Sequence, residues 1–265
     1  MHPFVAIMRR YVLDYLLCQN PDVCAQIMEP DYVLHMGGTD LGPRDSVYVP
    51  AVMRQLQQFP GLGMTVHEIL VSTDDRLAMR FSQHGASVRH NGRQASWGGI
   101  GLYRWNGERL TSNYAIEDYE SRRRQLATGV ALPVAAPAIA PWDTVAEEPS
   151  AAAEAVVRGW LLDGAAPAVG IAYDDEPVGT SVPLIDVDST VIDEMISAGR
   201  RVAFHITQTG RYRGELDLPG STVGAAATLY SVGVVGVDEA GRLAGRVIRE
   251  RGALHRTLST GTSRA

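Results

Sequence analysis

Apolar residues recur at helical spacing in three stretches near the start of the chain. The first stretch, residues 3–18, predicts an amphipathic helix, because its apolar side chains fall three or four residues apart. Asn20-Pro21 is typical of the N-cap and first residue of a short second helix ending near Met28. A third helix is predicted over residues 44–59, between two prolines. The chain therefore begins with a mainly helical segment.

From residue 65 the pattern changes to the alternation of apolar and polar positions that indicates β-strands. The predicted strands are 65–72, 77–86, 93–105 and 109–117, and a shorter strand at 32–36 precedes the third helix. Asn91-Gly92 and Asn106-Gly107 separate successive strands and are strong hairpin signals. Helices followed by an antiparallel meander predict an α+β fold in which helices cover one face of a curved antiparallel sheet.

The second half of the chain repeats the first. Residues 66–85 and 191–210 align without a gap, and the order of matching segments is preserved when Arg109-Leu110 is set on Arg242-Leu243 and Glu117 on Glu250. A repeat of this length matches a whole small domain, so we predict two tandem copies of one fold.

The domains predicted from this repeat are 1–128 and 150–265, joined by an Ala/Pro-rich linker at 129–149 that lacks periodicity. Predicted elements of the second copy are a helix at 150–162 and strands at 190–197, 201–209, 222–237 and 242–251. Between Gly164 and Asp188 the second copy has no clear counterpart of the second and third helices. We therefore interpret it as the eroded copy.

Composition and charge exclude several classes of function. The net charge is -6 and all basic side chains are arginine, so the chain lacks the basic excess of a nucleic-acid-binding protein and a lysine for Schiff-base or phosphate-loop chemistry. No apolar run of about 20 residues predicts a membrane helix. Cys18 and Cys24 have no disulfide or zinc spacing and are expected to be buried fillers in a reducing cytoplasm.

Several motifs of the first copy are similar to those of a known superfamily. They are Tyr32-Val-Leu-His35 followed by Gly-Gly, Arg80, His84-Gly85, and above all LYRWNGERLTSNYAIED at 102–118. In these motifs the chain resembles the nuclear transport factor 2-like superfamily, in its SnoaL-like polyketide cyclase and ketosteroid isomerase-like branch. The resemblance implies a cone-shaped apolar cavity in which acids, histidines and tyrosines transfer protons on a bound small molecule, usually without metal or cofactor.

Carried over by position, the resemblance makes Asp118, His84 and Tyr114 the catalytic candidates. The corresponding places in the second copy hold Arg251, Thr209 and Val247, which favours the first copy as the functional one. The candidate substrate-binding residues are Tyr32, His35, Met36 and Trp97.

Period-two alternation supports part of this assignment. It places Leu110, Tyr114 and Asp118 on one face of the last strand, where burial would raise the pKa of the carboxyl. His84 alternates with Arg80 and points away from the cavity unless a bulge intervenes.

Each candidate also has a structural interpretation. Asp118 can cap the following helix and pair with Arg122, and His84 can be a histidine on the sheet surface. His35 can bond a neighbouring loop, Tyr32 and Tyr114 can be pocket walls, and Trp97 can be sheet packing. No histidine pair has metal-ligand spacing on one element, so no metal site is predicted.

Two functions remain open at this point. One is a cofactor-independent enzyme acting on an apolar small molecule by cyclisation, isomerisation, dehydration or epoxide opening. The other is a non-catalytic small-molecule-binding or interaction protein. The second copy is expected to serve as an internal partner of the first in a pseudo-dimer, or the chain forms a homodimer.

Overall fold

The computed structural model describes residues 1–165, 167–176, 180–216 and 222–261. The first copy contains the helical segments α1 (Pro3–Arg10), η1 (Tyr11–Leu17), η2 (Pro21–Val23), α2 (Cys24–Ile27), η3 (Arg44–Tyr48), α3 (Val49–Gln58), η4 (Val88–His90) and α4 (Tyr119–Thr128). Its strands are β1 (Met28–Met36), β2 (Thr39–Leu41), β3 (Gly63–Ser72), β4 (Arg76–Ser87), β5 (Arg93–Trp105) and β6 (Leu110–Glu117).

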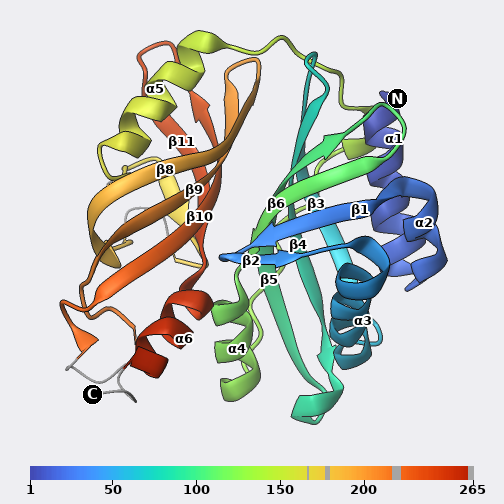
Figure 1. The fold of residues 1–265 in the computed structure, drawn as a ribbon, viewed down its shortest axis with the longest axis horizontal. Helices are drawn as coiled ribbons and strands as arrows, with labels where there is room; N and C mark the ends of the chain where they lie inside the picture. The colour runs from blue at the N-terminus through green and yellow to red at the C-terminus, as the bar shows by residue number, and fades with distance from the viewer. Residues whose placement is uncertain (166, 177–179, 217–221, 262–265) are drawn as a thin grey trace.

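One six-stranded sheet holds these strands in the order β2-β1-β6-β5-β4-β3. Strands β3 to β6 form the predicted antiparallel meander, and the turn between β4 and β5 uses left-handed Asn91 and Gly92, as the Asn-Gly signal predicts. β1 is parallel to β6, which the sequence pattern did not indicate. The helices α1, α2 and α3 cover the face of this sheet that points away from the second copy (Figure 1).

The second copy repeats the arrangement with fewer elements. It contains α5 (Ala151–Leu162), β7 (Ile171–Tyr173), β8 (Ile185–Ala198), β9 (Arg201–Tyr212), β10 (Ala226–Val237), β11 (Leu243–Arg249) and α6 (Arg251–Gly261). The strand order is β7-β11-β10-β9-β8, and β7 is parallel to β11 as β1 is to β6. Among the described residues of 163–184 the only helix or strand is β7, so the erosion expected there is observed. The predicted α+β fold of two tandem curved sheets is confirmed.

The uncovered faces of the two sheets lie against each other (Figure 1). One apolar cluster joins Ile100, Leu102 and Ile116 of the first sheet to Val232 and Ile248 of the second, all nearly inaccessible to solvent. Burial of apolar surface is the main favourable contribution to such contacts. The face of β4, β5 and β6 that points away from the helices is therefore a buried interface within the chain.

Two ion pairs cross this interface in a reciprocal manner. Arg76 Nη1 lies 2.6 Å from Glu194 Oε1, and Arg201 donates two hydrogen bonds of 2.7 Å to Glu68. In the aligned repeats Arg76 corresponds to Arg201, and Glu68 and Glu194 each follow a β-bulge in the first long strand of their copy. The pairing of one copy's arginine with the other copy's glutamate thus occurs twice.

The linker does not hang free of the first sheet. Ala138 N donates to Val66 O, Glu147 N donates to Val71 O, and Trp142 packs on the first core. Residues 129–135 are exposed by contrast.

Residues 129–135 are exposed, although Leu132 N donates a 2.8 Å hydrogen bond to Gln125 Oε1. We expect limited proteolysis to cut first within this stretch. Mass spectrometry of the first fragments measures the site. Initial cleavage inside β3 to β6 would contradict the proposed boundary between the copies.

Candidate functional site

A β-bulge decides which side chains of β6 face the first cavity. Leu110 pairs with Trp105 and Ser112 pairs with Arg104, so Thr111 is an extra residue in the strand. A bulge reverses the alternation beyond it. Leu110 therefore shares a face with Glu117 and not, as predicted from strict alternation, with Asp118.

The first cavity lies between the sheet and the helices and has a volume of about 80 Å³. Its walls are apolar side chains from η1, β1 and α3, among them Leu16, Leu34, Met36, Val52 and Leu56. Its polar groups are Tyr11, Tyr48, Gln55, Gln83, Glu117 and Tyr119. Glu117 is the one carboxyl among these lining residues, and it is not among the candidates predicted from the sequence.

Glu117 is buried at the end of β6, and its Oε2 accepts a 2.7 Å hydrogen bond from Trp97 Nε1. Burial raises the pKa of this carboxyl above its ordinary value, although the hydrogen bond from Trp97 and the charge of Arg122 act in the opposite direction. A carboxylate of raised pKa is a stronger base than an ordinary glutamate, as proton transfer from carbon requires.

Two amide side chains stand beside Glu117. Gln55 Nε2 donates a 2.6 Å hydrogen bond to Gln83 Oε1, and Tyr119 OH donates to Gln55 Oε1 at 3.1 Å. These bonds orient Gln83 and leave both hydrogens of its Nε2 without a partner among the described residues. The cavity thus combines a desolvated carboxyl with an available amide donor.

Arg122 stacks on three aromatic rings beside these residues. Its guanidinium carbon lies 4.1 Å from the ring centre of Tyr119, 5.0 Å from that of Trp97 and 5.6 Å from that of Phe59. Arg122, expected from its spacing to pair with Asp118, stacks instead on these aromatic rings on the side of Glu117.

Asp118 lies at the other side of the sheet, between the two copies. Its Oδ1 accepts a 3.0 Å hydrogen bond from Ser121 N, which caps α4, and a 2.8 Å hydrogen bond from Arg251 Nη2. Burial and the nearby charge of Asp174 raise its pKa, whereas Arg251 lowers it. The capping contact considered from the sequence is present, with Arg251 of α6 as the ion-pair partner.

Tyr114 and His35 also face the second copy. Their rings stack with centres 4.5 Å apart, and the Tyr114 ring lies 5.2 Å from that of His205. His35 Nδ1 lies 2.7 Å from Asp40 Oδ1. The structure therefore brings these two candidates together, but away from the first cavity.

His84 occupies the same face of β4 as Arg80, because the pairing of β4 with β5 continues without a bulge at this point. Its Nε2 lies 3.4 Å from Thr65 Oγ1. The His84 side chain therefore points away from the first cavity, as simple alternation along β4 predicts.

The remaining candidates lie on the cavity side. Met36 lines the first cavity, and Tyr32 is buried in its core with its hydroxyl donating to Asn113 Oδ1 at 2.6 Å. Trp97 packs between Phe59 and Leu126 and holds Glu117.

A second and larger cavity of about 270 Å³ lies in the second copy. Strand pairing shows which residues of the two cavities correspond. Gln208 pairs with Leu229 in the second copy, as Gln83 pairs with Trp97 in the first, so Gln208 corresponds to Gln83 and Leu229 to Trp97. The smaller leucine in place of tryptophan, and the absence of a helix like α3 among the described residues, leave this cavity wider.

Arg249 stands in the second cavity where Glu117 stands in the first. Arg249 pairs with Ser231 as Glu117 pairs with Gly99, and Glu250 caps α6 through Ala253 N as Asp118 caps α4. The correspondence of Glu117 with Glu250, and of Asp118 with Arg251, was therefore wrong by one residue. The bulge at Thr111 is the cause, because β11 has no such extra residue.

Among the residues that the structure describes, no group of three or more histidine, cysteine, aspartate or glutamate side chains could hold a metal ion. Within the same residues no helix is long and apolar enough to cross a membrane.

Comparison with known proteins gives similarity at the level of structure. No protein-family model matches the sequence, and no curated protein matches it. Over 48% of its length the chain is similar to 96% of AclR, named as a hydroxylase, from Streptomyces galilaeus, with 17% identity and a TM-score of 0.41.

Two further solved structures are named as polyketide cyclases. One, from Acidithiobacillus ferrooxidans, has 19% identity over 47% of this chain and 94% of its own, with a TM-score of 0.41. The other, a SnoaL-like protein from Shewanella denitrificans, has 13% identity over 48% of this chain and 99% of its own, again with a TM-score of 0.41. SnoaL-like proteins are the branch that the sequence motifs resemble.

Proposed function

We propose that the chain is a small-molecule enzyme that transfers a proton in the first cavity, with Glu117 as general acid and base. The observation that carries the proposal is a buried carboxyl of raised pKa in an apolar cavity beside an uncommitted amide donor. The cavity is smaller than common ligand pockets, which span roughly 300–1,000 Å³. It accepts the reacting end of an apolar carbonyl compound.

In this mechanism the Glu117 carboxylate removes a proton from the carbon next to the carbonyl. Gln83 Nε2 donates a hydrogen bond to the carbonyl oxygen and stabilises the enolate that forms. Glu117 then returns the proton to the same carbon or to a conjugated one, so that the reaction is an exchange or an isomerisation. Trp97 keeps the carboxylate oriented throughout.

The test is the exchange of hydrogen for deuterium next to the carbonyl of a small ketone, with cyclohexanone in D₂O as the probe and NMR as the readout. Glu117→Gln is expected to lower the exchange rate by about 10²-fold to 10⁴-fold. The rate of the unchanged protein should rise with pH through a pKa above 4.5, because the carboxylate is the base and burial raises its pKa.

Two variants serve as controls. Glu108→Gln, on an exposed turn, should exchange at the unchanged rate. Loss of exchange in Asp118→Asn with full activity in Glu117→Gln would move the chemistry to the interface between the copies. An unchanged protein that does not accelerate exchange would remove the proposal.

A second candidate function is ligand binding without turnover in the cavity of the second copy. Its volume of about 270 Å³ is closer to that of common ligand pockets, and Arg249 replaces the carboxyl there. Arg249 is held by Asp174 and Val182 O, so it is a fixed polar wall and not a proton-transfer group. This site supports the non-catalytic alternative.

We also propose that the two copies form an internal pseudo-dimer. The reciprocal pairs Arg76–Glu194 and Arg201–Glu68, together with the apolar cluster between the sheets, support an isologous arrangement.

A further inference from the structure

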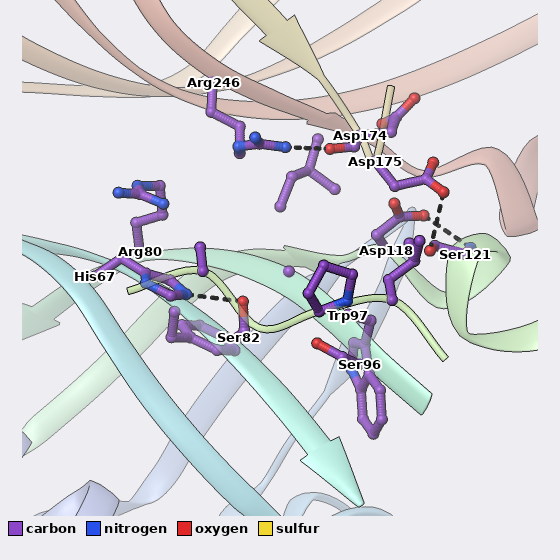
Figure 2. Close-up of a pocket in the computed structure, with 16 residues that line it drawn as sticks. His67, Arg80, Ser82, Ser96, Trp97, Asp118, Ser121, Asp174, Asp175 and Arg246 are labelled. Carbon is purple, nitrogen blue, oxygen red and sulfur yellow. Dashed lines mark hydrogen bonds between the residues drawn. The ribbon is translucent and has the colours of Figure 1, made fainter. Parts of the chain in front are cut away.

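A third cavity, of about 250 Å³, lies between the two copies and is covered by the exposed start of the linker. β3, β4 and β5 contribute one wall, β11 another, the start of α4 and Asp174-Asp175 one end, and Leu132, Pro133 and Ala135 the cover. Figure 2 shows its charged residues separated, with His67 and Arg80 on one side and Asp118, Asp174 and Asp175 on the other, while Arg246 extends over them from the second sheet.

The acidic side of this interdomain cavity is already neutralised. Asp174 is bound by Arg249 at 2.7 Å, and Asp118 by Arg251 at 2.8 Å. Asp175 is contacted by Arg251 at 2.9 Å and also by Arg124. The charge of each of these carboxylates is therefore balanced by an arginine of the protein.

The basic side is not neutralised. Arg80 lies 3.5 Å from Glu68, but Glu68 already accepts two shorter hydrogen bonds from Arg201. Arg246 donates one hydrogen bond, to the backbone oxygen of Asp174, and has no carboxylate partner among the described residues. Arg80 and Arg201 therefore share the one carboxylate of Glu68, and Arg246 has none, which leaves an excess of two positive charges.

His67 lies close enough to Arg80 and Arg246 for both positive charges to act on its ring. Its Nδ1 lies 2.8 Å from Ala136 O and its Nε2 2.8 Å from Ser82 Oγ. Burial lowers the pKa of His67; the bond to Ala136 O acts against this, and the charges of Arg80 and Arg246 lower the pKa further. A hydroxyl donor is nearby, because Ser96 Oγ has no hydrogen-bond partner in the described part of the chain.

We propose that the interdomain cavity binds a small organic monoanion. The carboxylate lies between Arg80 and Arg246, where planar guanidinium groups fit it well. The apolar body lies against Ile248 and the linker side chains Leu132 and Pro133. Inorganic phosphate is disfavoured because it has no apolar body to lie against these side chains. This site is separate from the proton-transfer cavity and does not depend on it.

The test is calorimetric titration of the full chain with benzoate and, separately, with inorganic phosphate. We expect one benzoate per chain, bound at least tenfold more tightly than phosphate. Arg80→Gln and Arg246→Gln should each weaken benzoate binding about 10-fold to 100-fold, the range for a hydrogen-bonded charge pair. The matched control Arg54→Gln, at an exposed position of α3, should bind as the unchanged protein does.

A further variant separates a lost site from a damaged fold. Ala135→Glu, at an exposed linker position, places a competing carboxylate over the arginines and should abolish benzoate binding with the melting temperature unchanged. Three results would overturn the proposal: no saturable binding of benzoate at about 20 mM, which is weaker than ordinary ligand binding, tighter binding of phosphate, or unchanged affinity in Ala135→Glu.

Discussion

Replacing Arg251 by methionine is expected to lower the free energy of unfolding by about 3–5 kcal/mol, the usual effect of removing one partner of a buried ion pair. The Arg251 side chain is 6% exposed; its Nη2 donates to Asp118 and Asp175, and its Nε lies 3.3 Å from Asp174 Oδ2. Without it, three carboxylates between the copies lose an arginine that they share. Urea unfolding at pH 7 measures the loss.

Arg124→Gln is the matched control, because Arg124 contacts the same Asp175 but is 54% exposed. Its loss should cost less than about 1 kcal/mol, as for other surface ion pairs. Adding Asp118→Asn to Arg251→Met should restore part of the stability, since one uncompensated charge is removed. An Arg251→Met variant as stable as Arg124→Gln would contradict a central role for this pair.

The second large effect is expected from Glu250→Gln and depends on pH. Burial raises the pKa of Glu250 from 4.5 to about 7. The folded protein holds this proton more tightly than the unfolded chain. The contribution of protonated Glu250 to the free energy of unfolding is therefore complete below pH 4.5, falls between pH 4.5 and 7, and is lost above pH 7. Glutamine mimics the protonated carboxyl and keeps the oxygen that accepts from Ala253 N.

At pH 8 Glu250→Gln is therefore expected to be more stable than the unchanged protein by up to about 3 kcal/mol, from 1.36 kcal/mol per pKa unit. At pH 4.5 the two should differ little. Urea unfolding at both pH values measures the difference, with Glu108→Gln on an exposed turn as the control. A stability gain that is equal at both pH values would show that the charge of Glu250 is not its cause.

Local patterns were sufficient to predict most of the fold. The strands β3, β4, β5 and β6 begin and end within two residues of the predicted ranges, because alternation and Asn-Gly turns are encoded locally. The parallel pairing of β1 with β6 was not predicted, since nothing within the β1 sequence records which strand it joins.

The candidate site was predicted less well, and one residue explains much of the difference. Thr111 is unremarkable in sequence, yet as a bulge it turns Glu117 into the first cavity and Asp118 toward the second copy. Likewise, Arg251 pairs with Asp118 from 133 residues away in the sequence, so no local pattern could predict this ion pair. The aromatic character of Trp97 signalled a packed residue, but not its hydrogen bond to Glu117.

The reciprocal ion pairs Arg76–Glu194 and Arg201–Glu68 join two copies that lie on one chain, as they would join two subunits of a homodimer. In a homodimer of identical subunits every substitution appears in both cavities at once. Here the two copies are encoded separately, so one cavity can keep Glu117 and Trp97 while the other acquires Arg249 and Leu229. Covalent fusion thus frees the two cavities to diverge in charge and size while the shared interface remains paired.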